Sequence, residues 1–178
     1  MNDLLEAMRS NDRERICDAI ITAGKESRRE LRPEIEAHLM NADAQIRAEA
    51  IKTLGFYWAI PEHHETARAM LEFDVEEDVR EMAALALSAY VDRRAEDLEL
   101  LLRIVTSDTE SEWLRDAVYD TAVVRAGLPR RQLAINTRRV PGFEQKADWK
   151  LLARLVETCG ELLPPRLREL AALGDGSA

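Results

Sequence analysis

Cysteine, glycine, proline and aromatic residues are all scarce in this chain of 178 residues. It contains two Cys, seven Gly, six Pro and three each of Phe, Tyr and Trp, so strand-forming aromatic and β-branched runs are scarce and helices are favoured over sheets. No apolar run is long enough to cross a bilayer, and the acidic start MNDLLEAMRSNDRE lacks the features of a signal peptide. We therefore expect a cytoplasmic protein with no membrane segment. Cys17 and Cys159 lack a CxxC partner and are expected to be buried free thiols in preference to a disulfide or a metal pair.

Positive charge is scarce over most of the chain. Residues 1–124 carry 15 Lys and Arg against 28 Asp and Glu, a net charge of −13. Residues 125–154 carry 8 against 2 (net +6) and residues 155–178 carry 2 against 4 (net −2), which makes −9 for the whole chain. A long acidic body repels polyphosphate, so a function that wraps nucleic acid is disfavoured. A protein partner with a basic surface is favoured instead.

A helical hairpin recurs along the chain, and its clearest copy is residues 43–72. The pattern apolar-Arg-x-x-small-x-x-x-Leu occupies 46–54, returns 33 residues later at 79–87, and returns again after 35 more at 114–122, with Ala in place of the last Leu. In the clearest copy a second helix is predicted to open at Pro61 and to fold back on the first. One hairpin cannot bury its own apolar face, so this period predicts stacked hairpins.

Glycine and helix-capping residues predict where the helices begin and end. Gly24, Gly55, Gly127 and Gly160 each follow an apolar stripe and are predicted to stop a helix. A continuous second helix is expected over residues 27–40. The run Ser107-Asp108-Thr109 is predicted to cap a helix that begins at residue 110.

The repeated pattern is an acidic turn, then Val/Ile-Arg, a small residue and Leu-Gly, followed by a second helix that begins at a proline. This pattern resembles the HEAT repeat. The form is closest to the short bacterial HEAT-like repeat also seen in phycobilisome lyase subunits, with a good match over 43–105 and a fair one over 106–136. The resemblance implies an all-α, right-handed α-α superhelical solenoid of about five helical hairpins. It would form a single domain, 1–178, with outer first helices and inner second helices on a concave face. The repeats would span approximately 11–40, 43–73, 74–106, 108–136 and 145–173.

The same resemblance implies non-catalytic protein binding on the concave face, as a scaffold, an adaptor or an immunity-type inhibitor. Two alternatives belong to other classes: an accessory subunit of an enzyme such as a phycobilin lyase, and a DNA binder of the HEAT-like glycosylase type. A glycosylase site would draw on Trp113, Asp116 and Trp149, but no flanking sequence supports that match. We expect no catalytic residue.

One arginine recurs at the same position of three of the five expected repeats, and aspartates cluster in the turns just before it. In HEAT-like proteins such positions commonly form a ladder of contacts between neighbouring repeats, because a guanidinium binds a carboxylate bidentately. A row of ligand-binding arginines is the alternative. The residues expected in the ladder are Arg47, Arg80, Arg115, Asp43, Asp74, Asp78 and Asp108.

Polar residues of the second helices are the candidates for partner binding. A basic cluster farther along the chain is either a solvated helix end or the positive half of a bipolar interaction surface. The candidates on the second helices are His64, Arg68, Glu72, Glu96, Glu99 and Arg103, and the basic cluster is Arg130, Arg131, Arg138 and Arg139.

Two further clusters are explained more simply by packing and exposure than by metal binding or catalysis. His63-His64-Glu65 resembles the His-Glu pairs of HEAT-like deoxyhypusine hydroxylases, but the chain has three histidines in all, and neighbours on a helix point about 100° apart. We therefore expect neither a metal nor another cofactor. In Phe56-Tyr57-Trp58 three successive residues cannot all face the core, so at least one of these rings is expected to be partly exposed.

Overall fold

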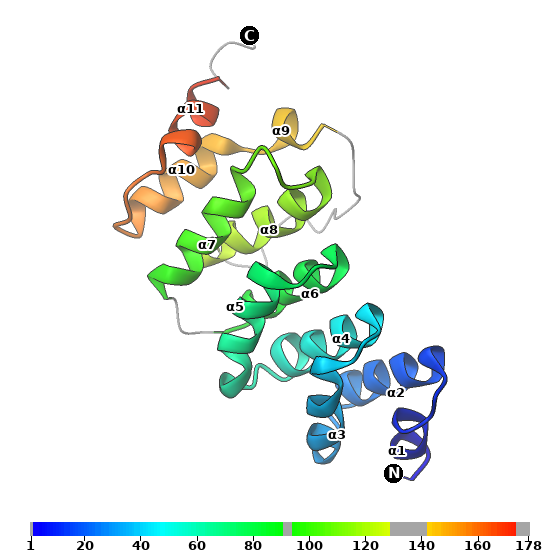
Figure 1. The fold of residues 1–178 in the computed structure, drawn as a ribbon. Helices are drawn as coiled ribbons and strands as arrows, with labels where there is room; N and C mark the ends of the chain where they lie inside the picture. Colours follow the sequence, from blue (N-terminus) through cyan, green and yellow to red (C-terminus); the bar gives the residue numbers. More distant parts are fainter. Residues whose placement is uncertain (1, 91–93, 129–141, 174–178) are drawn as a thin grey trace. The chain divides into compact units, whose positions relative to one another are not determined.

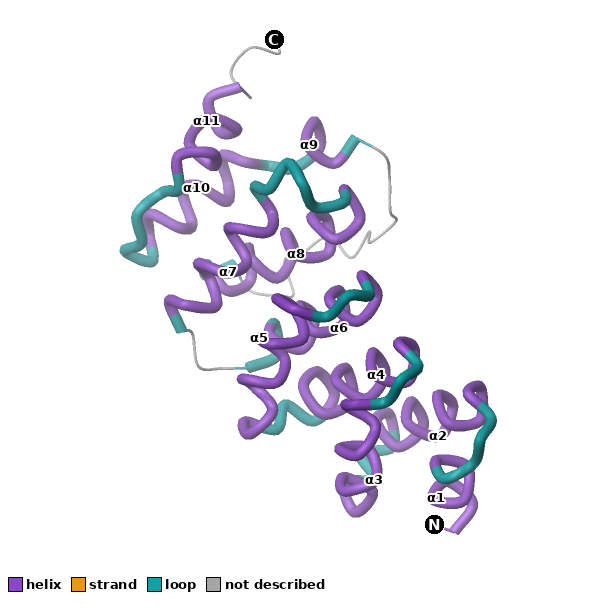
Figure 2. The backbone as a smooth tube through the Cα atoms, viewed as in Figure 1, coloured by secondary structure: helices purple, strands orange, loops and turns teal. Residues whose placement is uncertain are grey.

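The structure, a computed structural model, describes residues 2–90, 94–128 and 142–173. Within these ranges every regular element is a helix and none is a strand, which confirms the all-α prediction (Figures 1 and 2). None of the helices in the described ranges is long and apolar enough to cross a membrane. Internal contacts divide the chain into unit 1 (Met1–Val91) and unit 2 (Asp92–Ala178), and this boundary falls inside the third expected repeat. A single domain and a superhelical solenoid both stay predictions.

Unit 1 is a succession of hairpins whose first helices pack side by side. The helix α4 contacts both α2 and α6, while α5 packs against α6 (Figure 1). The shared interior is apolar, with Ile20, Ile51, Leu54, Leu71 and Leu87 completely buried. The elements of this unit are α1 (Asn2–Met8), α2 (Arg13–Lys25), η1 (Arg29–Leu31), α3 (Arg32–Ala37), η2 (His38–Met40), α4 (Ala44–Ile51), η3 (Lys52–Tyr57), η4 (Pro61–His63), α5 (His64–Phe73) and α6 (Glu77–Leu87).

Gly55 does not stop its helix, contrary to the sequence prediction. The helix widens here into the π-helical turn η3, in which the Trp58 amide donates to the Thr53 carbonyl at 3.1 Å. A Cβ on Gly55 would lie 2.4 Å from the Cβ of Ala86. Glycine at this position therefore allows α6 to approach η3 closely.

Gly24 was also predicted to stop a helix. This prediction is wrong because glycine at this position, as at Gly55, allows a close approach of another segment. α2 runs on to Lys25, and a Cβ on Gly24 would lie 2.8 Å from the ring of Tyr57. The chain leaves the helix instead through Ser27, whose φ is +55°. The expected continuous helix over 27–40 is three short pieces, η1, α3 and η2.

Unit 2 packs α7 (Ala95–Val105) against α8 (Glu112–Arg125), and α8 against α9 (Phe143–Lys146) and α10 (Trp149–Thr158). The last helix, α11 (Pro165–Leu173), packs on α10. Ser111 caps α8 by accepting from the Leu114 amide at 3.1 Å, so the predicted cap at 107–109 is wrong. Gly127 and Gly160 follow α8 and α10 with φ of +126° and +87°, which confirms both as helix ends.

Both cysteines are free thiols, but only Cys17 is buried. Burial and the nearby carboxylates, led by Glu49, raise the pKa of Cys17 to about 11. Cys159 is exposed at the end of α10, so the prediction that it is buried is wrong.

Candidate functional site

Arg47 on α4 holds two turns of unit 1 together. Its Nε and Nη2 donate to the two carboxylate oxygens of Asp74 at 3.0 and 2.8 Å. Its Nη1 donates to the carbonyls of Asn41 at 2.8 Å and Ala42 at 3.1 Å. The side chains of Arg47 and Asp74 are only 14% and 10% exposed. One guanidinium thus joins the turn before α4 to the turn before α6.

Asp74 is held as a carboxylate by these contacts. Burial would raise its pKa, but the hydrogen bonds from Arg47 and from the amides of Glu76 and Val75 outweigh that effect and keep the pKa below its usual value. The Glu76 amide donates to Asp74 Oδ1 at 3.0 Å, so this side chain orders its own turn as well as pairing with the arginine.

Arg80 and Arg115 stand at the same helix position as Arg47 and also reach back to the preceding helix. Arg80 Nε donates to the Leu71 carbonyl at 2.9 Å. Arg115 Nε donates to the Val105 carbonyl at 3.0 Å. Because a helix leaves its last carbonyls without intrahelical partners, each arginine satisfies an acceptor near the end of α5 or α7.

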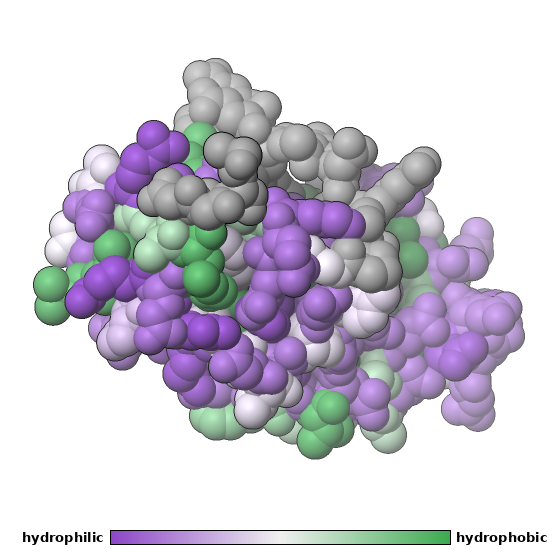
Figure 3. Space-filling view, turned by 90° about the horizontal axis from the view of Figure 1, so that it is seen from above, coloured by the Kyte–Doolittle hydropathy of each residue, from purple (hydrophilic) through white to green (hydrophobic). Residues whose placement is uncertain are grey.

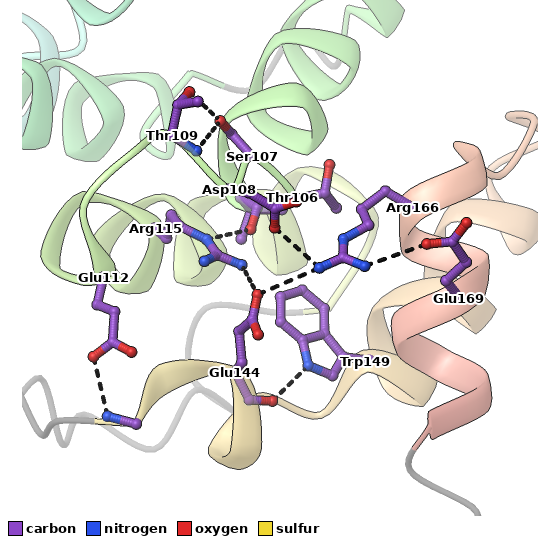
Figure 4. Close-up of polar contacts among 12 residues, drawn as sticks. Thr106, Ser107, Asp108, Thr109, Glu112, Arg115, Glu144, Trp149, Arg166 and Glu169 are labelled. Atoms are coloured by element: carbon purple, nitrogen blue, oxygen red, sulfur yellow. Dashed lines mark hydrogen bonds and ion pairs between the residues drawn. The ribbon is translucent and has the colours of Figure 1, made fainter.

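In unit 2 the arginine contacts extend into an ionic network (Figure 4). Arg115 Nη2 donates to Glu144 at 2.7 Å, and Arg166 Nη2 lies 3.9 Å from the same carboxylate. Arg166 also pairs with Asp108 at 2.9 Å and with Glu169 at 3.3 Å. The network links α8, α9, α11 and the turn that follows α7.

The four predicted aspartates have different roles in the structure. Asp74 pairs with Arg47, whereas Asp43 caps α4 by accepting from the amides of residues 45 and 46 at 2.9 and 3.4 Å. Asp108 pairs with Arg166 and not with an arginine of the repeated position. Asp78 lies exposed in the first turn of α6.

The predicted partner-binding residues fall in separate places. His64 is only 3% exposed and packs edge-to-face on Tyr90 with the ring centroids 5.0 Å apart, so its expected exposure on a binding surface is wrong. Its ring packs on Tyr90, which follows α6, because His64 shares the buried face of α5 with Ala67 and Leu71. Arg68 and Glu72 are half-buried on α5 of unit 1. On α7 of unit 2, Glu96, Glu99 and Arg103 are exposed on one face, and Arg130, Arg131, Arg138 and Arg139 lie outside the described residues.

Sequence reasoning missed a buried ion pair in unit 2. Arg125 on α8 pairs with Asp97 on α7, and their side chains are 2% and 0% exposed. Such a pair forms only where two helices bring both charges to the same buried point. The one signal in the sequence is that Arg125 interrupts the apolar run TAVVRAG.

Two carboxylates one turn apart on α8, Asp116 and Asp120, are the best candidates for acid–base chemistry. Burial, together with the charge of the neighbouring Asp116, raises the pKa of Asp120 to about 6. The pKa of Asp116 is also raised by burial, against the opposing charge of Lys146. Perturbed carboxylates can mark active sites, but in the part of the chain that the structure describes no group of three or more His, Cys, Asp or Glu could hold a metal ion.

The aromatic and histidine clusters have structural roles. Trp149 is buried, donates from Nε1 to the Glu144 carbonyl at 2.8 Å, and packs on Phe143 with 5.4 Å between ring centroids. His63 Nε2 lies 2.8 Å from the Glu36 carboxylate. Trp58 is buried, whereas Phe56 and Tyr57 are partly exposed, as the crowding of three successive rings requires.

Comparison with known proteins gives one match. The family model described as HEAT repeats matches residues 32–121, which is 90 of the 178 residues and runs from α3 into α8. No curated protein and no solved structure matches the chain.

Proposed function

Because this chain belongs to the HEAT-repeat family, we propose that it is a non-catalytic protein-binding scaffold whose acidic surface holds a basic partner. HEAT repeats generally serve as scaffolds for protein interactions. An adaptor or an immunity-type inhibitor is the finer form of this proposal, and both need a surface that recognises one partner.

The observation that carries the proposal is where the charges lie. Repeat arginines are directed inward: the side chains of Arg47 and Arg115 are 14% and 6% exposed and bind carbonyls and carboxylates of neighbouring elements. Many carboxylates stay on the outside, among them Glu65, Glu76, Asp78, Glu96 and Glu99. Hydrophilic side chains dominate the face drawn in Figure 3. In the described residues exposed Asp and Glu outnumber exposed Lys and Arg, which leaves a net negative surface for a positive partner.

The test is affinity capture with the tagged chain from its own cell lysate, followed by reconstitution with the purified partner in a calorimeter. We expect a basic protein whose binding weakens strongly between about 0.1 M and about 1 M salt, as the Debye length falls from about 10 Å to about 3 Å. Reversing the charge of Glu96 and Glu99 to Lys should weaken binding if α7 contributes.

Two outcomes would replace the proposal with another function. Retardation of duplex DNA at low salt by the chain alone would favour a glycosylase-type DNA binder. Copurification of a tetrapyrrole would favour a subunit of a phycobilin lyase. Failure to bind any protein specifically would remove the scaffold proposal itself.

A further inference from the structure

Half of the large hydrophobic side chains that stand exposed in the described residues are on two turns of unit 1. Singly exposed hydrophobic residues are ordinary and need no explanation. Met40, Phe73 and Val75, with exposures of 89%, 73% and 89%, instead flank the two turns that Arg47 joins, and we call them the turn ridge. The exposed large hydrophobic residues are Met40, Phe73, Val75, Trp113, Leu162 and Leu173.

The repeat itself brings the turn ridge together. Met40 is the last residue of η2 and Phe73 is the last residue of α5, 33 residues later, so they occupy equivalent positions of successive hairpins. Met40 precedes Asn41, whose carbonyl binds Arg47, and Phe73 and Val75 flank Asp74, whose carboxylate binds the same guanidinium. Each of the three hydrophobic residues is therefore next in sequence to a residue that binds Arg47.

These turns are ordered before any partner arrives. Asp43 caps α4 and Asp74 accepts from the Glu76 amide, so each turn is fixed by its own side chain in addition to the Arg47 contacts. A partner that docks here does not have to order the backbone, and this lowers the free-energy cost of binding.

Negative charge surrounds the turn ridge. The segment 68–80 contains Glu72, Asp74, Glu76, Glu77 and Asp78 against Arg68 and Arg80, a net charge of −3. Arg47 pairs with Asp74, and Glu76 and Asp78 are exposed. A second copy of this chain, with its net charge of −9, is disfavoured here by repulsion, whereas a positively charged segment is attracted.

We propose that the turn ridge docks a basic segment of a partner protein that carries bulky apolar side chains. The apolar side chains of that segment cover Met40, Phe73 and Val75, and its Lys or Arg residues face the carboxylates of 72–78. This inference rests on the scaffold function proposed above and places the contact on the turns between hairpins, in addition to any contact on the second helices.

The test uses the full chain and synthetic peptides of about 14 residues, which is four helical turns. The first peptide carries Leu and Lys at helical spacing. A second replaces its Leu by Ser, and a third replaces its Lys by Glu. Fluorescence anisotropy should show that the Leu/Lys peptide binds at least about tenfold more tightly than either control, because it alone combines apolar contact with positive charge.

The decisive variant replaces Met40, Phe73 and Val75 together by Ser, and Leu162→Ser is the matched control. Leu162 is 91% exposed and lies in unit 2. The triple variant should lose at least about tenfold in affinity for the Leu/Lys peptide, and Leu162→Ser should bind as wild type does. Unchanged circular dichroism and urea midpoints are expected for both variants, since the replaced side chains are exposed.

Several results would overturn the inference. Full affinity in the triple variant, an equal loss in Leu162→Ser, or equal binding of the Glu-containing peptide would each show that the turn ridge does not recognise a basic apolar segment. A wild-type dimer in sedimentation that Phe73→Ser dissociates would identify a second copy as the occupant. If the triple variant still holds the basic protein captured by wild type, this inference fails and the scaffold function stands.

Discussion

Replacing Gly55 by alanine is expected to destabilise unit 1, although alanine is the better helix former. Gly55 sits in η3 where α6 comes closest, and an added Cβ would lie 2.4 Å from the Cβ of Ala86 and 3.4 Å from its Cα. Carbon atoms pack best at about 3.5–4.0 Å, so η3 and α6 would have to separate by more than about 1 Å at this point. The Cβ of Ala86 is bonded directly to the backbone and cannot rotate away, whereas the Tyr90 hydroxyl, 3.2 Å from the added Cβ, is at the end of a longer side chain.

The magnitude follows from two opposing effects. Overpacking a core costs about 1–3 kcal/mol, and this contact lies near the upper value because its closest atom, the Cβ of Ala86, is fixed to the backbone. Helix propensity returns about 1 kcal/mol when alanine replaces glycine. The expected net loss in the free energy of unfolding is therefore about 2 kcal/mol.

Urea denaturation followed by circular dichroism measures the loss, and hydrogen exchange of α4 and α6 locates it in unit 1. The reciprocal variant Ala86→Gly, combined with Gly55→Ala, removes the contact at 2.4 Å, so the double variant should be less destabilised than the sum of the single ones by about 1–2 kcal/mol. Gly160→Ala is the control, because no atom lies within 4 Å of its added Cβ and its cost comes from φ alone. A more stable Gly55→Ala protein, or strictly additive effects, would refute the packing argument.

Three other predictions concern protonation and reactivity. Because the pKa of Asp74 is lowered in the folded state, its pairing with Arg47 stabilises the protein above about pH 4 and that stability is lost as the pH falls further. Asp74→Asn should thus cost about 2 kcal/mol in urea denaturation near pH 7, and an equal cost near pH 2 would contradict this. The pKa of Asp120 is raised to about 6, so its acid form stabilises the protein below about pH 4 and this contribution is lost as the pH rises through 6. After allowance for its partial exposure, Asp120→Asn should be more stable than wild type by about 1 kcal/mol near pH 8 but not near pH 4; no gain at high pH would argue against the burial effect. A thiol reagent should label exposed Cys159 at once and buried Cys17, whose pKa is about 11, only after unfolding. Two fast thiols in the native protein would be the contrary result.

Local patterns in the chain were enough to predict the helices and the repeat. The spacing of apolar residues and the recurring arginine identified the first helices of the hairpins, and the family match over residues 32–121 confirms the HEAT repeat. Gly127 and Gly160 were predicted correctly as helix ends, because a left-handed residue after a helix depends on its immediate neighbours alone.

Partners across hairpins could not be predicted in the same way. Asp43, Asp74 and Asp108 look alike as turn aspartates, yet one caps a helix, one binds Arg47 and one binds Arg166. The choice depends on which guanidinium lies within about 3 Å, and that distance is set by how neighbouring helices pack.

The sequence by itself determined that this protein is helical, acidic and built from a repeated hairpin, because periodicity, charge and composition are properties of the chain. Only the tertiary structure decided that Gly24 and Gly55 serve close helix contacts, that His64 is buried, and that Met40, Phe73 and Val75 flank two turns joined by one arginine. These features arise between segments about 30 residues apart. The physical reason is that burial and close contact depend on what another segment places beside a residue, and no local pattern records it.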